Sequence, residues 1–224
     1  MNSIKNLLIH VFLLHTCSFL SAQNDFGVIF GGNLATQTFY NPERPQDETT
    51  QYNNVLGFNS GIWFNQKIKS KFHLRLNLQY QQIGFKQPLQ TGTIGDPLSF
   101  QDIIIEDKFN YSSLDIDLIY YFKNKDVSPY IFAGLRNSYL LSHKASYDIM
   151  LIKDSYPFNE LYDFRNFLLG YKAGLGLKLN QSIHCDISFN RDLTPALKKP
   201  SLIAKNWFWS LNFFVGLKDL FNKG

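Results

Sequence analysis

The sequence predicts an all-β fold, an eight-stranded antiparallel up-and-down transmembrane β-barrel. Three observations lead to this prediction. Apolar and polar residues alternate strictly from Phe72 to Gln81, looser versions of the pattern recur along the chain, and the first 23 residues resemble an export signal. Alternate side chains of a β-strand lie on opposite faces. Each strand therefore has one apolar and one polar face, as strands of transmembrane barrels do.

The segment 1–23 has the parts of a secretory signal peptide. Lys5 supplies a positive charge, residues 7–14 form an apolar stretch, and small residues precede Gln23. The apolar stretch is shorter than the roughly 20 residues of a membrane-spanning helix. We therefore expect a signal peptide at 1–23, an outer-membrane β-barrel domain at 24–224, and export to the cell outer membrane.

The composition supports strands and an interface with lipid. Aromatic residues make up 16% of the 224 residues, with 21 Phe and 12 Tyr, and aromatics favour strands and membrane interfaces. Removal of the signal leaves Cys185 as the single cysteine, so the fold has no internal disulfide. The net charge of +4 is spread along the chain, and we expect no nucleic-acid partner.

Eight segments show the strand pattern. In chain order they are 26–38, 52–67, 71–87, 108–123, 129–145, 163–179, 182–192 and 205–218. The first is rich in glycine, and which of its two faces points inward stays open. The third contains the strict alternation. The fourth places Leu118 on one face and Asp115 and Asp117 on the other, with Ile119 as the exception. The sixth alternates large apolar residues with glycine and lysine, and the last alternates aromatic with small polar residues.

The connections between these segments alternate in length. Short connections with turn-forming residues fall at 67–71, 123–129 and 180–182. Long polar connections fall at 40–51, 88–107, 146–162 and 193–204. Outer-membrane barrels have short periplasmic turns and longer extracellular loops, so both ends of the barrel domain are expected on the periplasmic side. The apolar run 103–105 within a long connection either extends a strand or forms a small hairpin.

The polar face is expected inside the barrel, because an eight-stranded barrel is just wide enough for side chains to fill it. The predicted interior polar network consists of Arg75, Asp115, Asp117, Arg136, Lys172 and Asp186. The same face carries His73, Lys178 and His184. Arg75, Asp115, Asp117 and Arg136 lie on three consecutive strands and are expected to form its centre. Because unpaired buried charges are costly, we predict paired charges and a filled barrel rather than a pore.

A soluble lipocalin-like binding barrel is the alternative with reversed sidedness. Alternation alone does not separate the two folds. Strand length favours the membrane, since about 9–11 residues cross a bilayer and most predicted strands are longer. An aromatic belt near strand ends also favours it. The expected belt residues are Tyr80, Tyr120, Phe122, Tyr130, Trp207 and Trp209.

The sequence contains no recognisable catalytic motif. It has no Gly-rich phosphate loop, zinc-ligand spacing or paired-cysteine motif, so no catalytic residue, cofactor or metal ion is predicted. A lipid-modifying barrel enzyme stays open as an alternative, with His143 and either Ser142 or Ser146 as its candidate pair. Cys185 is in phase with apolar neighbours and is expected to face lipid.

Several segments together resemble the PorT-like outer-membrane β-barrel family. They are Phe26–Leu34, Ser113–Phe122 followed by Pro129–Gly134, and Gly174–Gly176 before Asp186–Phe189. The resemblance covers most of the chain after residue 23 and implies an outer-membrane barrel, in some members linked to protein secretion. It implies no catalytic residues. We therefore expect a small non-enzymatic protein that acts through external loops or as an accessory of a membrane or secretion assembly. Its expected partners are outer-membrane lipid and other envelope or secretion proteins.

Overall fold

The computed structural model describes most of the chain after the predicted signal peptide. The described residues are 24–40, 50–91, 101–123, 126–149, 152–154, 163–198 and 203–217. The predicted signal peptide 1–23 lies outside them. Within the described ranges, no helix is long and apolar enough to cross a membrane.

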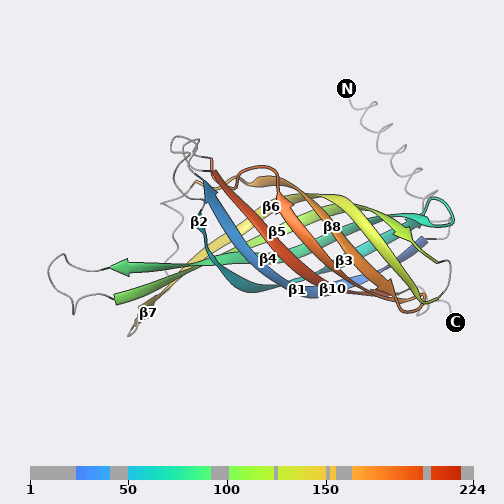
Figure 1. Ribbon diagram of the computed structural model, residues 1–224, viewed down its shortest axis with the longest axis horizontal. Coiled ribbons are helices and arrows are strands. Elements are labelled where there is room, and N and C mark those ends of the chain that lie inside the picture. Colours follow the sequence, from blue (N-terminus) through green and yellow to red (C-terminus); the bar gives the residue numbers. More distant parts are fainter. Residues whose placement is uncertain are drawn as a thin grey trace, which may run out of the picture.

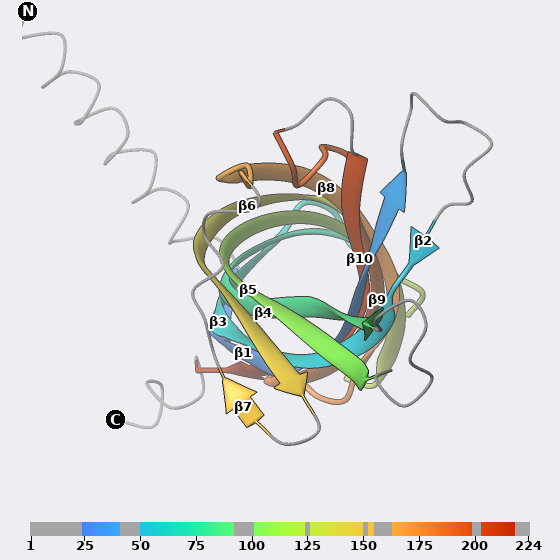
Figure 2. The ribbon, with the colours of Figure 1, turned by 90° about the vertical axis from the view of Figure 1, so that its left-hand side faces the viewer.

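Eight long strands pair in sequence order and close into a ring (Figures 1 and 2). They are β1 (Asn24–Tyr40), β3 (Asn53–Lys67), β4 (Phe72–Thr91), β5 (Gln101–Tyr121), β6 (Ser128–Ile149), β8 (Phe167–Lys178), β9 (Ile183–Asp192) and β10 (Ile203–Gly216). All neighbours are antiparallel, and β10 pairs with β1 to complete the ring. The short strands β2 (Thr50–Gln51) and β7 (Ile152–Asp154) add to β1 and β6. The predicted eight-stranded up-and-down barrel is confirmed.

The two ends of the barrel differ in their connections. Three short turns lie at one end, which we call the turn end, and the opposite end is the loop end. Asn180 shapes one of these turns, because its side-chain oxygen accepts hydrogen bonds from the backbone N–H groups of Ser182 and Ile183 at 2.8 and 2.7 Å. The first residues of β1 pair with the last residues of β10 at the turn end, with Gly27 opposite Gly216.

Three neighbouring strands extend beyond the others at the loop end (Figure 1). β4, β5 and β6 have 20, 21 and 22 residues, whereas β8, β9 and β10 have 12, 10 and 14. The β4–β5 pairing is continuous from Phe72 opposite Tyr120 to Thr91 opposite Gln101. The apolar run 103–105 therefore extends a strand, because continued pairing satisfies the backbone hydrogen-bonding groups. We call the parts of β4, β5 and β6 beyond Gln82, Ser112 and Leu141 the external extension.

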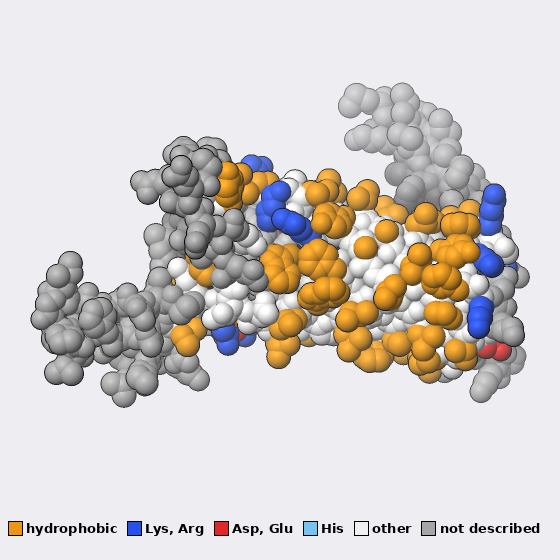
Figure 3. All heavy atoms as spheres, viewed as in Figure 1, with side chains coloured by type: hydrophobic (Ala, Val, Ile, Leu, Met, Phe, Trp, Pro, Cys, Tyr) orange, Lys and Arg blue, Asp and Glu red, His pale blue; other side chains and the backbone are white. Residues whose placement is uncertain are grey.

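The apolar faces of the strands point outward and the charged faces point inward. Leu118 exposes 51% of its surface, whereas Arg75 and Asp117 expose 1% and 0%. Figure 3 shows hydrophobic side chains distributed over the face of the cylinder that is in view. A lipocalin-like barrel would bury the leucine and expose the charges, so the alternative of a soluble binding barrel is wrong.

The outward apolar residues form a band that ends at similar heights around the ring. On the loop-end side, the last apolar or aromatic members include Leu34, Leu56, Tyr80, Leu114, Phe189 and Trp207. The next outward residues are polar, as Gln82, Ser112 and Arg191 show. The band spans about 9–11 residues of a strand, the length that crosses a bilayer. Five of the six expected belt residues lie on this outward face, and so does the half-buried Cys185.

Tyr130 is the exception, because it lies inside the barrel with only 1% of its surface exposed. The physical reason is on the neighbouring strand, where Gly176 lies opposite Tyr130 and Gly174 opposite Phe132. A Cβ at Gly176 would overlap the Tyr130 ring, and one at Gly174 would lie 2.6 Å from the Phe132 ring. The two glycines therefore leave the space that both rings fill, and the prediction of an outward Tyr130 was wrong.

Candidate functional site

Buried aromatic side chains fill the lumen at the turn end. Two clusters of buried residues lie here, made up of Ile29, Trp63, Ile119, Tyr121, Tyr130, Phe132 and Phe214. Trp63 donates its indole N–H to the Val28 carbonyl oxygen at 3.1 Å, and its ring lies 5.6 Å from that of His184. The interior, which was predicted to be polar, therefore also contains an apolar layer. The sequence-based prediction overlooked the aromatic residues at inward-facing positions of the strands, such as Phe132 and Phe214.

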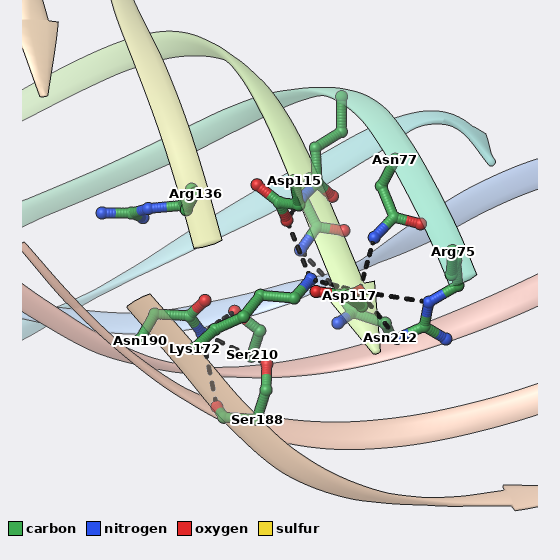
Figure 4. A network of polar contacts seen from close by, with 12 residues as sticks. Arg75, Asn77, Asp115, Asp117, Arg136, Lys172, Ser188, Asn190, Ser210 and Asn212 are labelled. Atoms are coloured by element: carbon green, nitrogen blue, oxygen red, sulfur yellow. Dashed lines mark hydrogen bonds and ion pairs between the residues drawn. The ribbon is translucent and has the colours of Figure 1, made fainter. Parts of the chain in front are cut away.

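A layer of paired charges crosses the middle of the lumen (Figure 4). Arg75 Nη2 lies 3.1 Å from Asp117 Oδ2 and 2.9 Å from Asp186 Oδ2. Lys172 Nζ lies 2.8 Å from Asp115 Oδ2 and 3.1 Å from Asp117 Oδ2. We call these five residues the ionic layer. Each has at most 3% of its surface exposed.

The ionic layer joins opposite walls of the barrel. Arg75 belongs to β4 and Asp186 to β9, and these strands are four positions apart in the ring of eight. A direct contact of 2.9 Å between them means that side chains bridge the full width of the lumen. Aromatic rings also contact the Arg75 guanidinium, with the Phe214 centroid at 4.2 Å and the Phe132 centroid at 4.9 Å.

Amide side chains complete the coordination of the three carboxylates. Gln79 donates to Asp115 at 2.7 Å, Asn77 to Asp117 at 2.9 Å and Asn212 to Asp186 at 2.9 Å. Further amides and hydroxyls continue this network on β1, β3, β9 and β10, through Asn33, Asn59, Ser188, Asn190 and Ser210. The sequence-based network omitted the amides, although the same inward phase of each strand identifies them.

Arg136 is not part of the ionic layer, in contrast to the prediction. It extends away from Asp115 (Figure 4) and forms an ion pair with Asp192. Gln81 accepts a hydrogen bond from Arg136 at 3.4 Å, and the Phe208 ring centroid lies 4.5 Å from the guanidinium. Lys172 occupies the space beside Asp115, and Asp192 offers a buried carboxylate nearer the loop end.

A second apolar layer covers the polar layers at the loop end. Its buried members are Ala35, Ile83, Phe85, Phe109, Tyr111, Leu168, Ala196, Leu197, Ala204 and Phe208. Phe39, Tyr52, Leu140 and Phe164 pack against it. A β-bridge between Phe164 and Leu197 joins the segments before β8 and after β9. The described lumen is therefore filled by polar layers between two apolar ones.

His143 lies beside this cover and not beside a serine nucleophile. Its Nε2 is 2.6 Å from Asp107 Oδ1, and its ring stacks on Phe109 with centroids 4.5 Å apart. Ser142 accepts a hydrogen bond from Asn110, and Ser146 donates to the Glu106 carbonyl oxygen. Both serines alternate with His143 and lie on the outward face, so the candidate catalytic pair is not assembled.

The outward face of the external extension carries charges. Glu106 forms ion pairs with Lys86 at 3.2 Å and Lys108 at 2.9 Å. Burial favours the neutral form of Glu106, but the hydrogen bonds and positive charges of Lys108 and Lys86 outweigh it and lower the carboxyl pKa below its ordinary value. Within the described part of the chain, no group of His, Cys, Asp and Glu side chains is arranged to hold a metal ion.

We expect the ionic layer to stabilise the barrel, because its buried charges are paired, and replacement of Asp115 tests this. In Asp115→Leu, Gln79 loses its acceptor and Lys172 loses its closer carboxylate while keeping Asp117. We expect a loss of about 1–3 kcal/mol, the cost of leaving a buried donor unsatisfied. Thermal unfolding in detergent, followed by circular dichroism, measures this effect. An unchanged melting temperature would count against this expectation.

The family of the chain follows from comparison with known proteins. The profile of the outer membrane protein beta-barrel domain matches residues 21–198. The chain belongs to this family. No curated protein matches the chain.

Three solved outer-membrane structures are similar to this chain over most of their lengths. Ail of Yersinia pestis is 15% identical, with a TM-score of 0.41, and the match covers 85% of this chain and 97% of Ail. OprG of Pseudomonas aeruginosa is 13% identical, with a TM-score of 0.41 and coverage of 86% and 95%. The protease OmpT of Escherichia coli is 9% identical, with a TM-score of 0.43 and coverage of 86% and 96%.

Membership of the outer-membrane family places the apolar band in the outer membrane. Barrels of this kind have short turns in the periplasm and longer loops outside the cell. We therefore expect the turn end on the periplasmic side and the external extension on the outside of the cell.

Proposed function

We propose that this protein is a small non-enzymatic outer-membrane barrel that acts through its external extension as an accessory of a membrane or secretion assembly. The contact of Arg75 with Asp186 across the lumen carries this proposal. A barrel bridged at its centre offers its outer surface, rather than a channel, for function. The resemblance to the PorT-like family supports the same class of role.

The external extension supplies the surface for such a role. Beyond Gln82 and Ser112, β4 and β5 continue for about ten residues, which at roughly 3.3 Å per residue is about 30 Å of strand. A strand needs only about 9–11 residues to cross the bilayer. The additional pairing therefore serves something other than membrane insertion. Its outward residues, including Lys86, Glu106 and Lys108, are suited to a partner with a polar surface.

The contribution of the extension is tested by shortening one hairpin. Phe85 lies opposite Asp107, so removal of residues 86–106 and closure with an Asn-Gly turn leaves the remaining β4–β5 pairing in register. We expect this variant to fold and insert, but to lose the envelope protein that the full-length barrel retains after mild detergent extraction. Affinity capture followed by mass spectrometry measures the loss.

Photo-crosslinking gives the matched control. Crosslinking amino acids at Lys108 and Lys144 report on the outward face of the extension, and one at Ile116 reports on the lipid-facing band. We expect a protein adduct from the first two positions and lipid adducts from the third. If the shortened barrel retains its partner, or if Lys108 and Lys144 give no protein adduct, the accessory role through this extension is incorrect.

A further inference from the structure

A cleft opens on the outward surface where β1, β9 and β10 approach the loop end. It has a volume of about 310 Å³ and is lined by Thr38, Phe189, Arg191 and Trp207. The three strands are hydrogen-bonded neighbours, and Trp207 lies opposite Arg191 in the β9–β10 ladder. The cleft is thus part of the rigid wall of the barrel and lies outside the lumen.

The side of the cleft toward the band is aromatic and held in place. Trp207 donates its indole N–H to Thr38 Oγ1 at 3.1 Å. The Phe189 ring centroid lies 6.1 Å from that of Trp207 and 5.3 Å from that of Trp209. Trp209 and Leu211 continue the same outward face into the apolar band, with 46% and 50% of their surfaces exposed. This side is therefore suited to acyl chains.

The side toward the loop end is cationic. Arg191 is exposed, and Lys205 lies opposite Thr38 in the β1–β10 ladder, next to the cleft. Neither Arg191 nor Lys205 forms an ion pair with another described residue. The adjacent Asp192 points inward to Arg136 and is not available to neutralise Arg191. Figure 3 shows basic side chains bordering the hydrophobic band over the outer ends of β9 and β10.

The position of the cleft matches the boundary between acyl chains and headgroups. Phe189 and Trp207 are the last aromatic residues of the band on their strands, and Arg191 and Lys205 are the next outward residues. Tryptophan is enriched at this level of a membrane. Basic residues at the same level attract anionic headgroups, and guanidinium groups bind phosphate oxygens in pairs.

We propose that this cleft binds a phosphate-bearing lipid of the outer leaflet. The phosphate contacts Arg191 and Lys205, and the acyl chains lie along Phe189 and Trp207. The site is independent of the proposed accessory role, because it lies on the opposite part of the ring from the β4–β5 hairpin. It would orient an annular lipid at one fixed place on the barrel.

Quenching of Trp207 by brominated lipids tests the proposal. Trp63 is inside the barrel with 2% of its surface exposed, so Trp209→Phe leaves Trp207 as the only lipid-facing tryptophan of the three in the chain. The barrel is inserted in phosphatidylcholine bilayers that contain a minor fraction of acyl-brominated phosphatidylglycerol or, for comparison, acyl-brominated phosphatidylcholine. We expect stronger quenching by the anionic lipid. In Arg191→Gln/Lys205→Gln this preference should be lost, because each cation removed lowers the association constant of the anionic lipid by about fivefold.

The matched control is Lys108→Gln/Lys144→Gln, which removes two cations from outward positions on the same side of the membrane but away from the cleft. We expect it to keep the preference. The single variants Arg191→Gln and Lys205→Gln should each lose part of it. Equal quenching by both lipids, or equal loss in the control, would overturn the site. If an excess of soluble glycerol phosphate abolished the preference, the cleft would bind free phosphate, and the proposed lipid ligand would be incorrect.

Discussion

Arg75→Met is expected to destabilise the barrel by about 3–5 kcal/mol, the range for removal of one partner of a buried ion pair. Arg75 neutralises both Asp117 and Asp186, and no other described cation contacts Asp186. Methionine fills part of the same volume between Phe132 and Phe214 but carries no charge. The ionic layer would then hold three carboxylates and Lys172 alone. Urea unfolding in detergent, followed by tryptophan emission, measures the loss.

A second substitution separates charge imbalance from lost packing. Asp186→Asn removes the carboxylate that depends most on Arg75 while its side chain keeps a polar contact with Asn212. The double variant Arg75→Met/Asp186→Asn should be more stable than Arg75→Met, because one uncompensated charge has been removed. Lys178→Met is the control for removal of a cation outside the ionic layer, since Lys178 is only half-buried at the turn end. Additive losses in the double variant would refute coupling through charge.

Ile116→Arg is expected to cost about 2–4 kcal/mol in a bilayer, the range for arginine on the lipid face near the membrane midplane. Ile116 points outward with 45% of its surface exposed, and its outward neighbours Leu114 and Leu118 are apolar and exposed too. A charge at this position has no internal partner and must stay in hydrocarbon or distort the bilayer. Guanidinium unfolding of the barrel in lipid vesicles measures the cost.

Ser112→Arg provides the control on the same strand and the same face. Ser112 is the first outward residue beyond Leu114, at the border of the apolar band. Near the interface an arginine costs about 0–1 kcal/mol. Equal costs at Ile116 and Ser112 would mean that the apolar band does not mark the hydrocarbon region of the membrane.

The alternation pattern was sufficient to predict the ring and the direction of most side chains. The inward direction of Arg75 on β4 and of Asp117 on β5 follows from the period of two within each strand, and the structure places both inside. Ile119 was the exception to the pattern of this strand, and the structure buries it with 1% of its surface exposed. The phase of the glycine-rich β1 was open, because glycine gives no hydrophobic signal. Its pairing with β3 and β10 settled this phase and placed Asn33 inside.

The pairing of interior charges could not be predicted from strand order. Arg136 lies directly opposite Asp115 in the β5–β6 ladder, and adjacency suggested an ion pair. In the closed barrel, Lys172 reaches Asp115 from β8, and Arg136 pairs with Asp192 on β9. These contacts join strands that are not neighbours in the ring. They depend on the curvature and width of the cylinder, which no local pattern encodes.

The sequence by itself determined that this chain is a β-barrel with a lipid-facing exterior and a charged interior, because side-chain direction along a strand has a fixed period. Only the tertiary structure decided which residues meet inside. Gly174 and Gly176 leave room for the inward-facing rings of Phe132 and Tyr130, and ring closure brings Asp186 to Arg75. The physical reason is that contacts across a lumen are set by the shape of the closed sheet, whereas the face of each strand is set by its own backbone.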